Sequence, residues 1–253
     1  MCSSDLEYQP PHVGLAATFP VRVTEASSDE VAIRAMRDRA RAKSSTGSDY
    51  VRTILCRFLC AVAVERTQVA GAFEYRLRVI RQAGHVPVAL EYIAQHGVQV
   101  AGWNVAGSDL PMLFQTALKS SGTASDYCSR PDKPWDGPDY FSRHSSHVVD
   151  LQDIVGGRPS LHEAAVALGI PGKLGTSGGD VADLWLAGEH EAIAAYCTTD
   201  ALTTAAIWQR VAHLAGHIDL EAERGALLAL AEEQDTDACR AWLDAWPARR
   251  DAA

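Results

Sequence analysis

The sequence has 253 residues, of which 47% are hydrophobic and 22% charged, and its formal net charge is −9. This composition is typical of a globular protein large enough to bury a core, and no apolar run approaches the roughly 18 residues that a membrane-spanning helix needs. The acidic balance argues against a protein that holds nucleic acid on a broad basic surface, because phosphate contacts need clustered Lys and Arg. It leaves open an enzyme that touches a few nucleotides beside a divalent cation.

The first half of the chain alternates between expected strands and helices. In chain order these are a short strand at 3–9, a helix in the polar stretch 25–49, a β-hairpin from the runs 51–65 and 73–80, a helix at 87–97, a strand at 98–104 and a helix at 108–122. The hairpin is predicted because the first run is β-prone and apolar and the second alternates. Such alternation of strands and helices predicts an α/β core.

The second half is expected to be mostly helical. It contains a long loop at 123–146, a strand or helix start at 147–155, a helix at 160–170, a Gly-rich connection at 169–180, two further helices of which the second spans 189–211, and a helical tail at 216–253. Lys173 lies in the Gly-rich connection, but the order G-x-x-x-x-G-K-[ST] is absent, so we expect a mobile connection rather than a P-loop.

The helix at 189–211 turns a carboxylate toward its apolar face. Asp200 lies seven residues after Ile193 and seven before Ile207, which places the three side chains on one face. Tyr196 is one turn earlier and projects with Asp200. Because burying an unpaired carboxylate is costly, Asp200 needs either a metal ion or an Arg or Lys partner.

Further acidic residues stand where an α/β sheet presents its side chains. Asp5 and Glu7 are two apart, so on a strand they point to the same side. Asp109 opens a helix just after a strand, where open α/β folds usually place their sites. If these groups converge with Asp200, they cannot all stay ionised without cations between them. Two divalent metals would resolve that conflict, and they also suit in-line displacement at phosphorus.

The order of these motifs resembles a known family. The patterns D-x-E, N-(x)4-D and Y-x-x-x-D look like the three motifs of the tyrosine-containing branch of DEDD superfamily 3′→5′ exonucleases. The chain is most similar to predicted exonucleases related to the proofreading domain of family B DNA polymerases. The resemblance covers most of 1–215, and its most specific segments are GWNVAGSDLPML at 102–113, HVVDLQDI at 147–154 and the block at 167–210.

The resemblance implies a role for each acidic residue. Asp5, Glu7 and Asp200 would bind one metal ion, and Asp5 would also hold a second one. Asp109 would act on the second metal directly or through water. Tyr196 would orient the attacking water beside the 3′-terminal phosphodiester.

The resemblance also implies a fold and a substrate. The expected fold is RNase H-like, an α/β architecture with a mixed central sheet flanked by helices, over 1–215, with 216–253 as a C-terminal helical extension. Asn104, Leu6 and Ser108 would line the substrate cleft. The implied reaction is hydrolysis of single-stranded DNA from its 3′ end to nucleoside monophosphates with two Mg²⁺ or Mn²⁺ ions, RNA being the alternative substrate.

Other interpretations of the same residues remain open. Ser108 and Asp109 form a natural helix start, where negative charge favours the helix dipole. Only MCSS precedes Asp5, so either the natural start lies upstream or the first motif is poorly anchored, as in a catalytically inactive module that binds nucleic acid or protein.

The cysteines and the first residues of the sequence indicate the cellular compartment. The six cysteines, at positions 2, 56, 60, 128, 197 and 239, form no Cys-x-x-Cys pair and no zinc spacing, so we expect free thiols. A thiol-based redox protein is a further alternative that rests on the cysteine count alone. The opening segment lacks the basic start and apolar run of a secretory signal, and we expect a cytoplasmic protein.

Overall fold

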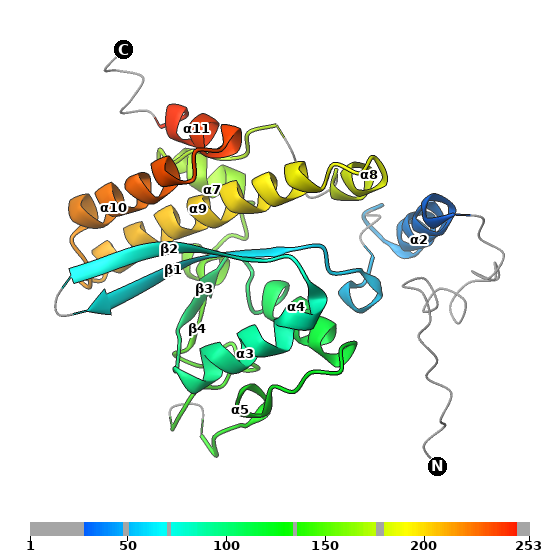
Figure 1. Ribbon diagram of the computed structural model, residues 1–253, viewed down its shortest axis with the longest axis horizontal. Coiled ribbons are helices and arrows are strands. Elements are labelled where there is room, and N and C mark those ends of the chain that lie inside the picture. The colour runs from blue at the N-terminus through cyan, green and yellow to red at the C-terminus, as the bar shows by residue number, and fades with distance from the viewer. Residues whose placement is uncertain (1–27, 48–50, 70–71, 134–135, 176–179, 247–253) are drawn as a thin grey trace.

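The structure is a computed structural model that describes residues 28–47, 51–69, 72–133, 136–175 and 180–246 (Figure 1). Asp5, Leu6 and Glu7, and with them the strand expected at 3–9, lie outside the described residues. Within the described ranges no helix combines the length and apolar character needed to cross a membrane.

The predicted β-hairpin is confirmed. Strands β1 (Ala61–Val69) and β2 (Ala72–Ile80) pair antiparallel, with Ala61 opposite Ile80 at the open end. The prediction that the first strand starts near residue 51 was wrong: Thr53–Leu55 forms a 3-10 turn instead. The physical reason is that β2 ends at Ile80, so residues before Ala61 have no strand to pair with.

A second, parallel pair lies below the hairpin in Figure 1. Strand β3 (Val100–Gly102) pairs with β4 (Val148–Asp150). The segment that predicted a strand or a helix start forms both, because β4 passes directly into helix α6 (Leu151–Val155). The described residues therefore form a mixed α/β structure with two small two-stranded sheets.

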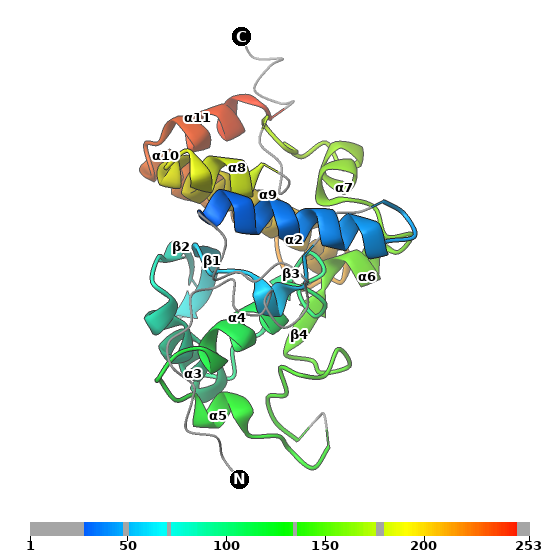
Figure 2. The same ribbon diagram turned by 90° about the vertical axis from the view of Figure 1, so that its right-hand side faces the viewer.

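Helices form most of the remaining described structure. They are α2 (Asp29–Lys43), α3 (Val86–Gln95), α4 (Asp109–Leu118), α5 (Ser125–Cys128), α7 (Leu161–Ala167), α8 (Val181–Leu186), α9 (His190–Leu214), α10 (Leu220–Glu233) and α11 (Asp237–Asp244), with a 3-10 turn at Ala83–His85. The predicted helices are confirmed in these positions. Helix α2 packs beside α8 (Figure 2).

The segment predicted as a long loop contains the short helix α5. A carboxylate from α3 stabilises its start: Glu91 accepts hydrogen bonds from the Ser125 hydroxyl at 3.0 Å and from the backbone N–H of Asp126 at 2.9 Å. The sequence pattern missed this helix because its N-terminal donors are satisfied by a residue 35 positions away rather than by a local cap.

The long helix α9 is the centre of the larger hydrophobic cluster. It lies between the hairpin and the pair α10 and α11 (Figure 1). Leu202 and Ile207 of α9 are fully buried against Leu227 of α10 and Trp242 of α11. A second cluster joins α3 and α4 to the strand pair, with Tyr127 at its centre. The two clusters fix α9 and α4, the two helices that carry the predicted site residues.

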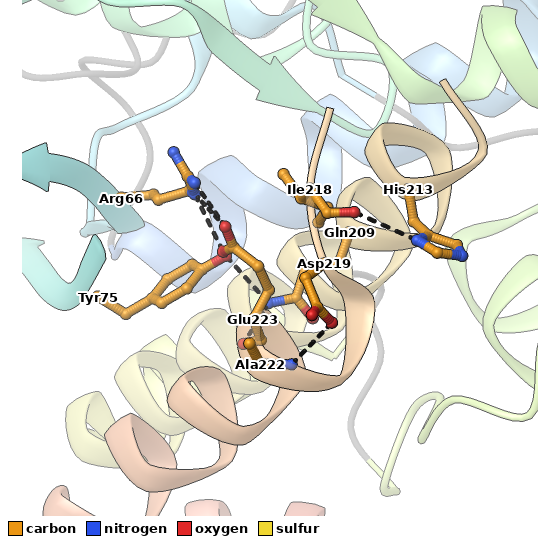
Figure 3. Close-up of polar contacts among 8 residues, drawn as sticks. All are labelled: Arg66, Tyr75, Gln209, His213, Ile218, Asp219, Ala222 and Glu223. Carbon is orange, nitrogen blue, oxygen red and sulfur yellow. Dashed lines mark hydrogen bonds and ion pairs between the residues drawn. The ribbon is translucent and has the colours of Figure 1, made fainter. Parts of the chain in front are cut away.

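A buried ion pair connects the hairpin to α9 and α10. Glu223 of α10 is 2% exposed and accepts hydrogen bonds from Arg66 of β1 and from the hydroxyl of Tyr75 of β2 (Figure 3). Gln209 of α9 donates to the Tyr75 hydroxyl at 3.0 Å and to the Glu223 backbone carbonyl at 2.8 Å. Because every polar group in this network has a partner, the charge is tolerated in the interior.

Replacing Glu223 by glutamine tests this connection. The amide keeps the size of the side chain but removes the charge facing Arg66, so we expect the free energy of unfolding to fall by about 3 kcal/mol, as when one partner of a buried ion pair is lost. Urea denaturation followed by circular dichroism measures the change.

Glu221→Gln is the matched control. Glu221 lies on the same helix, in an exposed pair with Arg224, and its replacement should cost less than about 1 kcal/mol. Equal losses in the two variants would show that the buried pair contributes no more than a surface pair.

Candidate functional site

The turn after β3 positions the first described site residues. Asn104 adopts a positive φ of 56°, and its backbone N–H donates to the Asp150 carboxylate at 3.1 Å, as does that of Ala106 at 3.2 Å. Asp150 is 7% exposed and ends β4, which is parallel to β3, so its carboxylate lies at the same edge as the turn. A Cβ at Gly107 would collide with the Asn104 side-chain oxygen, so a larger residue there would force the Asn104 side chain to move.

Asp109 follows this turn as the first residue of α4. Ser108 makes no side-chain capping hydrogen bond to the helix. The structure therefore does not support the interpretation of Ser108 as a side-chain cap. As a whole residue Asp109 is exposed. Nevertheless the surrounding protein displaces much of its hydration and raises its pKa to about 6, with the nearby charges of Asp150 and Asp200 adding to the effect.

Tyr196 and Asp200 lie on one face of α9, between the buried Ile193 and Ile207. Asp200 is half-buried, and its partial burial raises its pKa, while a hydrogen bond from the Tyr196 hydroxyl and the charge of Lys173 oppose the increase. Burial and the Asp200 charge raise the pKa of Tyr196, so that hydroxyl stays protonated at neutral pH.

The positive charge of Lys173 is held near Asp200 by a defined backbone. The Lys173 backbone N–H donates to His162 Nδ1 at 3.0 Å, and the carbonyl of Pro171 accepts a hydrogen bond from Thr203 of α9 at 3.0 Å. A Cβ at Gly172 would collide with the His162 ring. The expected mobile connection is thus attached to both α7 and α9 at 171–173, which the sequence pattern did not indicate.

Of the predicted catalytic residues, three lie near one another in the structure, and two lie outside the described residues. Asp109 and Asp200 interact electrostatically, and Tyr196 bonds to Asp200. Asn104 is exposed on the turn before Asp109, and Ser108 is half-buried beside it. The D-x-E motif and Leu6 lie outside the described residues.

Asp150 is a residue of this site that sequence reasoning missed. Its charge reaches Asp109, and its oxygens accept hydrogen bonds from the backbone N–H groups of Asn104, Ala106 and Gln152. These bonds hold the turn that leads into α4, so Asp150 positions Asp109. The only available signal was its place at the end of a strand, within the segment at 147–154.

The donor set fits a hard divalent cation only in part. Across the ranges that the structure describes, no three His, Cys, Asp or Glu side chains form a group able to hold a metal ion. Asp109 and Asp200 supply carboxylate oxygens, which Mg²⁺ and Mn²⁺ prefer, and burial is the main cause that raises the pKa of both. Two further carboxylates, as in the D-x-E motif, would complete a site of this kind.

Comparison with known proteins identifies the family. Residues 48–246 match a family described as a predicted 3′–5′ exonuclease related to the exonuclease domain of PolB. The chain belongs to this family. Asp109, Tyr196 and Asp200 lie within the part that matches the PolB-exonuclease-related family, whereas Asp5 and Glu7 precede it. Searches of curated proteins and of solved structures find no significant match.

Asp109→Asn tests the electrostatic cost of the site. The Asp109 carboxyl titrates near pH 6 in the folded protein but near its ordinary 3.8 in the unfolded chain. Between these pH values the folded state keeps a proton that the unfolded state has lost, so the stability of wild type falls as the pH rises through this window. The variant lacks this fall, and its melting temperature in chelator should exceed that of wild type above pH 6 and approach it toward pH 4.

Asp237→Asn is the matched control for this experiment. Asp237 is also the first residue of a helix, α11, but its side chain is 99% exposed and pairs with Arg240. Its replacement should give no gain in melting temperature at any pH. If the melting temperature of Asp109→Asn depends on pH as that of wild type does, the folded protein does not raise the pKa of the Asp109 carboxyl group, and the prediction is wrong.

Proposed function

We propose that the protein is a metal-dependent 3′→5′ exonuclease that hydrolyses phosphodiester bonds of single-stranded DNA and releases nucleoside monophosphates. The observation that carries the proposal is the meeting of Asp109 from α4 with Tyr196 and Asp200 from α9. Asp109 lies 87 positions before Tyr196 and 91 before Asp200 in a chain of the PolB-exonuclease-related family. Helices that converge on interacting carboxylates favour an active site over separate structural roles.

The proposed architecture follows from the same family. The RNase H-like fold, with a mixed central sheet flanked by helices, would occupy 1–215, and the strand with the D-x-E motif would join that sheet. Residues 216–253 would be a helical extension. In the described part of that extension, α10 and α11 cover α9, so the extension would hold the site helix in place rather than contact substrate.

The proposed metal site uses four carboxylates. Asp5, Glu7 and Asp200 would hold one divalent cation, Mg²⁺ or Mn²⁺, and Asp5 with Asp109 would hold the other. When bound, such a pair supplies a nucleophile at neutral pH and neutralises charge on the attacking and leaving oxygens. Asp109 is an exposed residue at the start of α4, so a cation from solution would reach this end of the helix.

The remaining side chains would orient water and substrate. Tyr196 is protonated and donates to Asp200, so its hydroxyl would position the attacking water rather than remove a proton from it. Lys173 brings a positive charge close to Asp200, where it would attract a substrate phosphate. Asn104, Leu6 and Ser108 would line the cleft that receives the 3′-terminal nucleotides.

Degradation of a 5′-labelled single-stranded DNA oligonucleotide tests the proposed activity. We expect a ladder that shortens from the 3′ end with Mg²⁺ or Mn²⁺ and stops in chelator. Asp200→Asn and Asp109→Asn should each lower the rate at least about a hundredfold, since each loses charge that holds a metal ion. Tyr196→Phe should lower it by up to about a hundredfold through misplaced water.

Asp237→Asn is the control for charge removal away from the site, and it should keep the wild-type rate. An RNA oligonucleotide of the same sequence decides the preferred sugar, because discrimination depends on contacts to the 2′-hydroxyl. Folded wild type that degrades neither strand would contradict the proposal and favour the inactive binding module.

Metal binding can be measured without turnover. Mn²⁺ at about a hundred times its dissociation constant should stabilise wild type by about 2.7 kcal/mol, because it binds the folded state alone. Thermal denaturation with and without Mn²⁺ gives this shift, and Asp200→Asn should lose most of it. A wild-type melting temperature indifferent to both Mg²⁺ and Mn²⁺ would rule out the proposed metal site.

A further inference from the structure

Two cysteines far apart in sequence meet beside the candidate site. Cys60 immediately precedes β1, Cys197 lies on α9 next to Tyr196, and their sulfur atoms are 3.6 Å apart. This contact forms where β1 packs on α9. A disulfide has an S–S length of about 2.05 Å, so the two sulfurs would have to approach by only about 1.5 Å to bond.

A cavity leads to this pair. It has a volume of about 210 Å³ and is lined by Leu59, Cys60, Arg81, Trp185, His190 and Ile193. A water molecule occupies about 30 Å³ of liquid, so a small hydroperoxide fits beside the Cys60 sulfur. Cys197 does not line the cavity, and Cys60 is therefore the sulfur that an oxidant inside this cavity meets.

The surroundings also favour a thiolate at Cys60. The hydrogen bond between the Cys60 and Cys197 sulfurs is the main cause that lowers the pKa of Cys60 to about 7, and the Arg81 charge adds to it, against the opposing effects of burial and Glu191. The same contact raises the pKa of Cys197. The thiolate is the reactive form of cysteine, so within this pair Cys60 is the nucleophile. Cys197 is the resolving thiol, which attacks Cys60 after Cys60 has been oxidised.

The other described cysteines lack this combination. Burial raises the pKa of Cys56 against the opposing charge of Lys119, and the Cys56 thiol donates to the backbone carbonyls of Val51 and Arg52. Cys239 is fully buried, and Cys128 is exposed on α5. In the part of the chain that the structure describes, Cys60 with Cys197 is the pair whose sulfur atoms are in contact.

We propose that Cys60 and Cys197 are a peroxide-reactive dithiol that closes into a disulfide. The Cys60 thiolate attacks one peroxide oxygen, the O–O bond breaks, and the departing hydroxide takes up a proton to become water, leaving Cys60 as a sulfenic acid. The Cys197 sulfur then attacks the Cys60 sulfur, the S–O bond breaks, and a second water leaves as the S–S bond forms. The two thiols are oxidised by two electrons in total and one peroxide is reduced.

Closure would change the candidate site through α9. The bond joins the root of the hairpin to the residue after Tyr196, and a displacement of about an ångström in a catalytic group lowers rates by about two orders of magnitude. This consequence rests on the proposed nuclease function, whereas formation of the disulfide does not.

Peptide mapping of the full-length protein tests the disulfide directly. Wild type is treated with hydrogen peroxide, free thiols are alkylated, and the protein is cleaved with trypsin without reductant. Cleavage after Arg57, Arg66, Lys173 and Arg210 separates Cys56 from Cys60 and yields the peptides 58–66 and 174–210. We expect these two peptides joined, with a mass two hydrogens below their sum, and separate again after dithiothreitol.

Cys60→Ser should give no joined peptide, and Cys128→Ser, the matched control at an exposed thiol, should give the wild-type result. Peroxide treatment that leaves 58–66 and 174–210 separate in wild type, or that converts Cys60 to a sulfinic acid without joining them, overturns the proposal.

The nuclease rate tests the consequence for the site. Peroxide should lower the wild-type rate about a hundredfold, dithiothreitol should restore it, and Cys60→Ser should keep its rate through the same treatment. An oxidised wild type that retains its rate overturns the inhibitory effect. If reduced wild type degrades no oligonucleotide, the nuclease proposal has failed, while the peptide map still decides whether the dithiol exists.

Discussion

The ion pair between Arg66 and Glu223 is the constraint on which the arrangement of the fold depends. A two-stranded hairpin is marginal by itself in water, so β1 and β2 need a partner that fixes their position. Glu223 supplies it, because burying a carboxylate that is 2% exposed is costly unless Arg66 and Tyr75 stay in place as its partners. Gln209 adds α9 to the same network. The hairpin, α9 and α10 therefore hold one relative position rather than sliding past each other.

The fixed position of α9 against the hairpin and α10 determines where its site residues lie. The helix is held by the hairpin and by α10 and α11, and the charge of the Asp200 side chain reaches Asp109 of α4. On the α4 side, the Asp150 carboxylate performs the corresponding function by holding the turn before Asp109. The two carboxylates of the candidate site are thus fixed from separate hydrophobic clusters, each with its own buried acidic residue.

Sequence periodicity predicted the parts of the molecule that depend on local rules. The hairpin and the helices follow from repeats of two and 3.6 residues, and the inward direction of Asp200 follows from its spacing to Ile193 and Ile207. The start of β1 at Ala61, the capping of α5 by Glu91 and the meeting of Cys60 with Cys197 were not predictable in this way. Each depends on residues more than 10 positions apart, and no local pattern records such contacts. The candidate site required both kinds of information: motif order selected Asp109, Tyr196 and Asp200, but only the structure revealed Asp150 and the attachment of Lys173.

The raised pKa values of Asp109 and Asp200 show that the fold holds these carboxylates where ionisation is costly, mainly because the surrounding protein displaces water from them. At Asp109 the charges of Asp150 and Asp200 add to this cost, and at Asp200 the donor from Tyr196 and the charge of Lys173 offset it only in part. The helices do not move to relieve this cost, because the packing and the Glu223 network that fix them gain nothing from such a movement. A scaffold that holds carboxylates where ionisation is costly favours binding of a divalent cation, since the cation would offset that cost. In the proposed metal site, the rigidity of the frame around α9 would therefore contribute directly to the affinity for the cation.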